Sequence, residues 1–241
     1  MKGILKTFKD PEGLADRVSE LIMGWIALSR ESRFHLALSG GSTPNLLLTA
    51  LAKKYANSGH WQKTNIWWVD ERMVRPDDPQ SNFGVAQNLL FSKIDIPVKN
   101  IHRIRGEENP IKESICYGEL INRELNSRNN LPKFDLLLLG MGEDGHTASI
   151  FPNQMELMKS KRIYEVAFHP ETNQPRVTMT GRTINNSSRI CFLVTGANKA
   201  ERLSEIKMNG RKAKRLPAAL IYPDKGELYW FADEAASRLL S

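Results

Sequence analysis

The stretch FDLLLLGMGEDGHTASIFP, residues 134–152, decides the fold class of this chain. Its first six residues are apolar except for one aspartate and show no alternation, which is typical of a strand covered on both faces in a parallel sheet. The next seven residues hold three glycines, two acids and a histidine. Because ligands in open parallel sheets bind beyond the carboxyl ends of the strands, this loop is a candidate functional site.

Similar apolar runs on both sides of this stretch predict further strands. They lie at residues 34–38, 65–69, 189–194 and 227–231, with weaker ones at 101–104, 162–168 and 176–180. Segments with helical periodicity or helix-start signals lie between them, at residues 11–28, 44–55, 82–91, 113–125 and 198–207, and a closing helix follows residue 231. This alternation predicts an α/β fold with a mostly parallel, doubly wound sheet and helices on both faces, a Rossmann-like three-layer sandwich. No linker or repeat divides the chain, so we expect a single domain over residues 1–241.

The composition is that of a globular protein with a sizeable core, since 41% of the 241 residues are hydrophobic and 25% are charged. The first residues lack the features of a secretory signal, and the longest mostly apolar run, residues 21–28, is too short to cross a bilayer. Cys116 and Cys191 lack metal-ligand spacing and lie in segments that look buried, so we expect free thiols in a reducing compartment. A cytoplasmic protein without a membrane partner is therefore expected.

The net charge of +7, from 34 basic and 27 acidic residues, suits either nucleic acid or a small anionic substrate. The main basic cluster, KMNGRKAKR at residues 207–215, contains no aromatic residues and belongs to no recognition-helix or RNA-binding motif. It is interpreted as a solvated loop, and no nucleic-acid partner is expected.

Four predicted strand ends carry loops rich in glycine or charge. They are SGGSTP at residues 39–44, DER at 70–72, GMGEDGH at 140–146 and TGANKA at 195–200. Because the carboxyl ends of parallel strands share one edge of a sheet, the four loops are expected to lie together along that edge.

The first loop is a candidate phosphate site. Gly40 and Gly41 allow close approach of the backbone to an anion, while Ser42 and Thr43 add hydroxyl donors and can cap a helix that begins near Pro44. An ordinary turn with a helix cap is the alternative, and the lysine of a Walker A loop is absent.

Arg72 and Lys199 strengthen the phosphate interpretation because each lies just beyond a buried strand. An arginine binds phosphate through two parallel hydrogen bonds, and a lysine adds a point charge. The alternatives are an ion pair of Arg72 with Asp70 or Glu71, and a solvated position for Lys199, although lysine is poorly matched to a helix N-terminus.

His146 is the candidate general base, and Asp144 the carboxylate that orients it. A metal site is disfavoured because no other histidine shows ligand spacing relative to His146, and a structural histidine that caps the loop is a further alternative. Ser42 as a nucleophile with His146 as its base is a further alternative, but the chain lacks the Gly-x-Ser-x-Gly pattern of that chemistry.

Taken in order, SGGSTP, WWVDERMVRPDDPQSNFGVAQNLL, FDLLLLGMGEDGHTASIFP, PRVTMT and TGANKAERL resemble the 6-phosphogluconolactonase family. The resemblance implies hydrolysis of a phosphorylated sugar lactone in the oxidative pentose phosphate pathway, without metal or other cofactor. It implies catalysis by His146 and a sugar-facing role for Asp70, with Arg176 near the site. It places the substrate phosphate among Gly41, Ser42, Thr43, Arg72 and Lys199.

Two other functions remain as alternatives. The chain is more distantly similar to the glucosamine-6-phosphate deaminase/isomerase family, whose motif carries a ring-opening glutamate before the proline, where this chain has Phe151. A non-catalytic phosphosugar sensor is the second alternative, although no helix-turn-helix segment precedes residue 34. We expect a lactonase that acts as a monomer, with a weak dimer as the alternative state.

Overall fold

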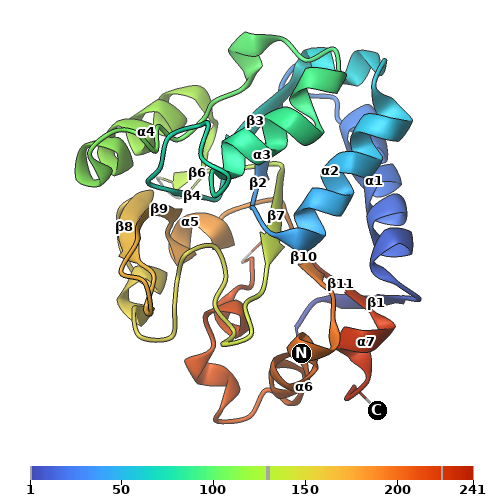
Figure 1. Ribbon diagram of the computed structural model, residues 1–241, viewed down its shortest axis with the longest axis vertical. Coiled ribbons are helices and arrows are strands. Elements are labelled where there is room, and N and C mark those ends of the chain that lie inside the picture. The colour runs from blue at the N-terminus through green and yellow to red at the C-terminus, as the bar shows by residue number, and fades with distance from the viewer. Residues whose placement is uncertain (1, 129–130, 224, 241) are drawn as a thin grey trace.

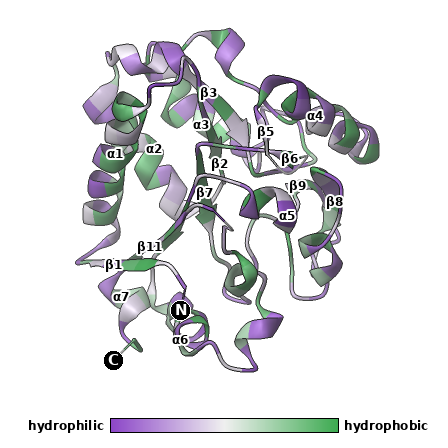
Figure 2. Ribbon diagram, turned by 180° about the vertical axis from the view of Figure 1, so that it is seen from behind, coloured by the Kyte–Doolittle hydropathy of each residue, from purple (hydrophilic) through white to green (hydrophobic). Residues whose placement is uncertain are grey.

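The computed structural model describes residues 2–128, 131–223 and 225–240 and contains a six-stranded central sheet in which every strand pairing is parallel. In spatial order its strands are β1 (Ile4–Phe8), β11 (Glu227–Asp233), β10 (Arg189–Val194), β7 (Leu136–Gly140), β2 (Phe34–Leu38) and β3 (Thr64–Trp68). All residues of β2 and β3 are buried, as the apolar runs without alternation predict. The central strands are correspondingly coloured as hydrophobic in Figure 2.

Helices flank this sheet (Figure 1). They are α1 (Pro11–Leu28), α2 (Ser42–Tyr55), α3 (Asn82–Leu89), α4 (Pro110–Glu124), α5 (Gly181–Asn185), α6 (Ala200–Met208) and α7 (Glu234–Ser237). In both views α1 and α2 lie on one side of β2 and β7, whereas α4 lies on the other side. The predicted doubly wound α/β class is confirmed.

The positions of β2 and β7 create a place for a ligand. The two strands are neighbours at the centre of the sheet, but the chain continues from β2 to β3 on one side and from β7 to β10 on the other. The loops that leave their carboxyl ends therefore diverge, and a crevice opens between them. This point is where the predicted glycine-rich loops at residues 39–44 and 140–146 begin.

A second, antiparallel sheet was not predicted. It consists of β4 (Asp70–Arg72), β9 (Pro175–Met179) and β8 (Tyr164–Phe168). The DER segment is therefore a short strand rather than a loop, and the two weaker strands expected near residues 162–168 and 176–180 belong to this sheet. Val69 joins the two sheets, because its N–H donates to Leu38 O at 2.8 Å and its carbonyl accepts from Met179 N at 2.8 Å. A further two-stranded pair is formed by β5 (Ser127–Arg128) and β6 (Leu131–Pro132).

Three other expectations are corrected. The strand expected at residues 101–104 is reduced to one β-bridge between Ile101 and Ile66. Two residues later, the side chain of Arg103 forms an ion pair with Glu107. The edge strand β1 was missed, because most of its residues are exposed and it lacks an apolar run. Cys116 is exposed, whereas Cys191 is buried as expected, and both thiols are free. Among the described residues, no helix is both long and apolar enough to cross a membrane.

Candidate functional site

A pocket of about 210 Å³ lies at the crevice between β2 and β7. Its walls come from all four loops that the sequence singled out, so the expectation that they meet at one edge is confirmed. The lining residues are Ser39, Gly40, Gly41, Ser42, Thr43, Pro44, Asp70, Arg72, Asn82, Gly140, Met141, Gly142, His146, Ala148, Arg176, Leu193, Thr195 and Lys199.

The glycine-rich loop presents a helix N-terminus to this pocket. Helix α2 begins at Ser42 rather than near Pro44, and Gly41 is its N-cap with φ of 120°, a conformation that favours glycine. No side chain caps the helix, so the expected capping by Ser42 or Thr43 is wrong; Thr43 Oγ1 instead lies 2.6 Å from Thr195 Oγ1. The first N–H groups of α2 therefore remain available to an anion.

The side chain of Asn82 packs directly against Gly40 in the lining of the pocket. A Cβ atom at residue 40 would lie 1.8 Å from Asn82 Oδ1, so only glycine fits there. The amide nitrogen of Asn82 donates to Asp70 O at 2.9 Å, which ties α3 to β4. Sequence reasoning did not single out Asn82, because its contacts join segments far apart in the chain.

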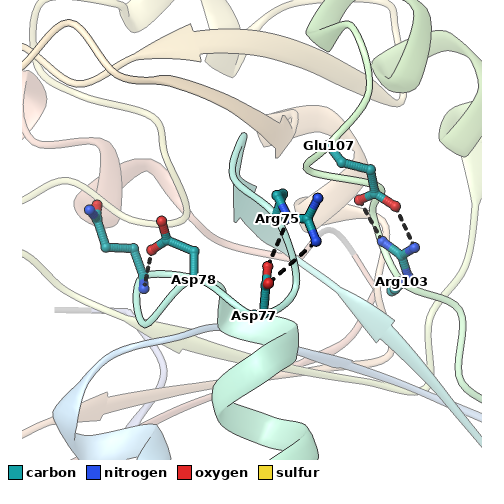
Figure 3. Close-up of polar contacts among 6 residues, drawn as sticks. Arg75, Asp77, Asp78, Arg103 and Glu107 are labelled. Atoms are coloured by element: carbon teal, nitrogen blue, oxygen red, sulfur yellow. Dashed lines mark hydrogen bonds and ion pairs between the residues drawn. The ribbon is translucent and has the colours of Figure 1, made fainter.

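Arg72 and Arg176 are direct partners on the neighbouring strands β4 and β9. Arg72 Nη1 donates to Gln80 O at 2.8 Å, and the backbone N–H of Gln80 donates to the carboxylate of Asp78. Figure 3 shows the loop that carries Asp78. It also shows the ion pairs of Arg75 with Asp77 and of Arg103 with Glu107. In the described part of the chain Arg72 forms no ion pair with Asp70 or Glu71, so that alternative is wrong.

Both arginines carry buried donors that face no described acceptor. The Nε atoms of Arg72 and Arg176 are buried and have no hydrogen-bond partner among the described residues. Burial lowers the pKa of Arg176, although Asp70 partly offsets this effect. A buried donor without a partner costs free energy, so these two Nε atoms are held at the expense of stability.

Glu71 fixes the turn that carries Arg72. Its carboxylate accepts the backbone N–H groups of Arg72, Asn82 and Phe83 at 2.7 to 2.8 Å. Burial raises the pKa of Glu71 to about 7, against the effect of these hydrogen bonds. Glu71 is only 1% exposed and does not line the pocket, so it is interpreted as a structural residue.

Lys199 is the N-cap residue of α6. It is half-buried, lines the pocket and forms no ion pair with any described residue. The turn before it is held by Asp233, whose carboxylate accepts the N–H of Gly196 at 3.0 and 3.1 Å. Because a lysine is unfavourable at a helix N-terminus, its position beside the pocket is consistent with an anionic ligand.

His146 and Asp144 form a close pair at the edge of the pocket. His146 Nδ1 lies 2.6 Å from Asp144 Oδ1, and the same oxygen accepts the His146 backbone N–H at 3.0 Å. Burial opposes ionisation of Asp144, but its hydrogen bonds with His146 and the charge of His146 outweigh burial and lower the pKa of Asp144. Since a carboxylate only accepts hydrogen bonds, Nδ1 carries a proton, and in the neutral ring Nε2 is free to accept one.

Two further contacts limit the His146 ring. A Cβ atom on Gly142 would lie 2.1 Å from His146 Nδ1, so glycine is required for the close approach of the loop. On the other side, the buried ring of Phe151 lies 4.7 Å from the imidazole, centroid to centroid. Phe151 also contacts His169 at 5.4 Å and lies 5.7 Å from the Arg176 guanidinium.

Asp70 is buried, at 5% exposure, and lines the pocket. Its Oδ2 accepts from Ser149 Oγ at 2.7 Å. Ser149, three residues after His146, was not predicted from the sequence. Thr195 lies within the TGANKA loop, but no role was predicted for it. Only the position of Ser149 inside the conspicuous motif could have indicated it.

Within the described residues, no group of three or more histidine, cysteine or acidic side chains is placed to hold a metal ion. His35 is buried and His102 is half-buried, and both rings contact Trp67. The polar groups that converge on the pocket are therefore a histidine–carboxylate pair, three cations, one further carboxylate and a helix N-terminus. This arrangement can bind a small anion and move a proton beside it.

Comparisons with known proteins agree with these features. The family model described as glucosamine-6-phosphate isomerases/6-phosphogluconolactonase matches residues 9–230. A 6-phosphogluconolactonase of Aggregatibacter actinomycetemcomitans is 40% identical over 235 residues, which cover 97% of this chain and 98% of that protein. One from Haemophilus influenzae is 45% identical over 207 residues, or 86% of this chain and 87% of its own. The crystal structure of a 6-phosphogluconolactonase from Thermotoga maritima matches with a TM-score of 0.84 at 30% identity, over 96% of this chain and 100% of that chain.

Proposed function

The chain belongs to the glucosamine-6-phosphate isomerase/6-phosphogluconolactonase family, and from this membership we propose that it hydrolyses 6-phosphoglucono-1,5-lactone to 6-phosphogluconate, a step of the oxidative pentose phosphate pathway. It is then a carboxylic ester hydrolase. The single observation that carries the catalytic part of the proposal is the 2.6 Å pair of His146 and Asp144 in the same pocket as the helix N-terminus of α2.

The substrate phosphate binds at the cationic end of the pocket. It is close to dianionic at neutral pH and accepts from the loop Gly40–Thr43, from Arg72 and from Lys199. The position of Arg72 in the lining of the pocket supports this placement, because a guanidinium binds phosphate through parallel hydrogen bonds. Binding of the phosphate positions the lactone carbonyl, which lies at the other end of the substrate, relative to the catalytic groups. Part of the binding energy is therefore used to orient the reacting carbonyl.

His146 acts as the general base. Its Nε2 accepts a proton from water while the water oxygen forms a bond to the lactone carbonyl carbon, and the carbonyl electrons move to oxygen. The tetrahedral oxyanion then collapses and the bond from C1 to the ring oxygen breaks. The proton on His146 passes to the departing ring oxygen, which becomes a hydroxyl. Asp144 keeps the imidazole in the required tautomer through its contact with Nδ1.

Asp70 and Arg176 act at the sugar end of the pocket. Arg176 lies against Phe151, which in turn contacts His146, so its guanidinium is near the reacting centre rather than only near the phosphate. We assign Arg176, together with backbone N–H groups of the loop at residues 140–145, to stabilisation of the oxyanion. Asp70 is assigned to the sugar hydroxyls, as an acceptor.

Phe151 favours a lactonase over a deaminase. The ring-opening chemistry of a deaminase needs a carboxylate at this position, and here a buried phenyl ring lies against His146 instead. Lactone hydrolysis needs no such group, because the substrate is already an activated ester. We further propose that the protein acts as a monomer in the cytoplasm; the two free thiols support a reducing compartment.

Acid release tests the proposal. Freshly prepared 6-phosphogluconolactone is added to the protein in weak buffer, and the rate of acid release is compared with the spontaneous rate. The proposal predicts a rate that rises in proportion to protein concentration. A rate that stays at the spontaneous value, with 6-phosphogluconate still bound, would instead favour a phosphosugar sensor.

The role of Ser42 separates direct water attack from an acyl-enzyme. Ser42 lies in the first turn of α2 and is exposed to the pocket. Because we assign it to the phosphate, Ser42→Ala is expected to raise KM and to leave most of kcat. Loss of turnover in Ser42→Ala, at an unchanged melting temperature, would establish the acyl-enzyme route instead.

A further inference from the structure

Ser149 is the only described residue that forms a hydrogen bond with the carboxylate of Asp70 or the guanidinium of Arg176. Its Oγ donates to Asp70 Oδ2 at 2.7 Å and accepts from Arg176 Nη1 at 3.4 Å. No other hydrogen bond reaches the Asp70 carboxylate or the Arg176 guanidinium from the described part of the chain. Both of these side chains line the pocket, whereas Ser149 is 0% exposed and lies behind them.

The chemistry of the three groups fixes the direction of the contacts. A guanidinium only donates and an ionised carboxylate only accepts, whereas a hydroxyl has one proton to give and lone pairs to receive. The order must therefore be Arg176 to Ser149 to Asp70. Hydrogen bonds in such a row polarise one another, and a bond to a charged group is stronger than a neutral one.

The loop after His146 holds Ser149 in place. Thr147 and Ile150 close a tight turn through a 2.9 Å hydrogen bond, and Ala148 between them adopts φ of 52°, in the left-handed region. The Thr147 hydroxyl donates to Gly140 O at 2.9 Å, and the Ser149 N–H donates to Thr178 Oγ1 at 3.1 Å. The same loop therefore carries the general base and the hydroxyl that joins β4 to β9.

We propose that Ser149 is a positioning residue that holds Asp70 and Arg176 as one unit against the sugar end of the substrate. This inference rests on the proposed lactonase function. Without the hydroxyl, Arg176 loses its one hydrogen bond and can swing away from the oxyanion, and Asp70 is left buried without a donor. The phosphate end, held by residues 40–43, Arg72 and Lys199, does not depend on Ser149.

The test is Ser149→Ala, with Ser187→Ala as the matched control. Ser187 is equally buried, its hydroxyl has no described partner, and it does not line the pocket. In Ser149→Ala kcat is expected to fall roughly tenfold or more, with little change in KM, because a hydrogen bond to charged groups is lost while the phosphate grip is kept. Ser187→Ala is expected to retain both constants.

A double-mutant cycle distinguishes positioning from general destabilisation. Asp70→Ala removes the acceptor and breaks the same unit, so the combined variant with Ser149→Ala should be little slower than Asp70→Ala alone. Ser149→Cys, which keeps the size of serine but donates weakly, should show the same loss and serves where the alanine variant does not fold. The inference is overturned if Ser149→Ala retains the kcat of Ser187→Ala, or if its effect multiplies fully with that of Asp70→Ala. A wild-type protein without lactonase activity would instead overturn the proposed function.

Discussion

At the scale of single residues, the orientation of His146 depends on three neighbours of different kinds. Asp144 binds Nδ1, Gly142 leaves room for the ring because it has no side chain, and Phe151 covers one side of the imidazole. Together these contacts restrict the side-chain torsions of His146 and therefore the direction of its Nε2. Orientation of this kind matters because a small misplacement of a base lowers the rate strongly.

Phe151→Leu is predicted to slow the reaction. Leucine keeps an apolar side chain but removes the aromatic contacts with His146 and His169 and the cation–π contact with Arg176, each worth about 1 kcal/mol. We expect kcat to fall roughly fivefold, which corresponds to loss of one such contact in the transition state.

The control for this prediction is Phe134→Leu. Phe134 is just as buried but packs against Trp67, away from the pocket. Both variants should lose similar stability in thermal unfolding, and only Phe151→Leu should lose kcat. Equal effects of the two variants on kcat would mean that Phe151 contributes packing alone.

The sequence indicated His146, Asp144 and the glycine-rich loop because their chemistry is local. A histidine with a nearby acid, or glycines before a helix, can be recognised from residue type and short spacing. Asn82 and Ser149 could not be found in this way. Their partners, Gly40 and Asp70, are tens of residues away in the chain, so only the packed fold brings them together.

At the scale of elements, β2 and β3 are joined by a buried aromatic cluster around Trp67. The Trp67 indole N–H donates to His35 Nδ1 at 3.1 Å, and the His102 ring stacks on Trp67 at 3.9 Å. Burial, with a smaller contribution from the charge of Arg33, lowers the pKa of His35 to about 4. The hydrogen bond also requires neutral His35, because a protonated Nδ1 cannot accept.

This cluster predicts an acid-sensitive part of the folding free energy. The pKa of His35 is depressed in the folded state, so the unfolded chain takes up the proton first. The contribution of neutral His35 to the free energy of unfolding is complete above pH 6.5. It is lost as the pH falls toward 4, and the total loss is about 3 kcal/mol. The free energy of unfolding of the wild type should therefore fall faster over this range than that of His35→Gln.

Urea unfolding at several pH values between 7.5 and 4 measures the effect, with His60→Gln as the control because His60 is exposed. The control should follow the wild type. Parallel curves for the wild type and His35→Gln would show that His35 is not held neutral by the fold.

Elements with strong patterns were predicted well, whereas those that depend on distant pairing were not. The buried strands β2, β3, β7 and β10 each carry a continuous apolar run. The edge strand β1 does not, and the three residues of β4 form a strand only because β9 pairs with them. Whether a short segment is a loop or a strand is decided by its partner.

At the scale of the whole molecule, the parallel and antiparallel sheets are joined by buried tyrosines as well as by Val69. The Tyr164 hydroxyl donates to Trp68 O, and the Trp68 N–H donates to the Tyr117 hydroxyl at 3.0 Å. The Tyr117 hydroxyl in turn donates to His102 O at 2.7 Å. On these contacts we propose that the two sheets fold together, as one domain.

The proposal predicts one unfolding transition. Tryptophan fluorescence and far-UV circular dichroism should give coincident thermal curves, and Tyr164→Phe should shift both curves together to lower temperature, because a buried hydrogen bond is lost. Two separate transitions, with the antiparallel sheet melting first, would contradict the single domain.

The topology of the whole sheet follows from the sequence only in outline. Alternating strands and helices predict a doubly wound sheet and a site at the carboxyl edge. They do not give the strand order, and it is the neighbouring position of β2 and β7 that brings residues 39–44 close to His146. The site could thus be located at an edge, whereas its exact partners required the fold.

The central claim, that His146 removes the proton from the attacking water, is tested most directly with His146→Ala. Acid release from freshly prepared 6-phosphogluconolactone gives the rate, and calorimetry with 6-phosphogluconate gives the affinity of the phosphate site. We expect a loss of roughly 100-fold or more in kcat with affinity retained, because the phosphate is held by other groups. Turnover close to that of the wild type would contradict the assignment of the base.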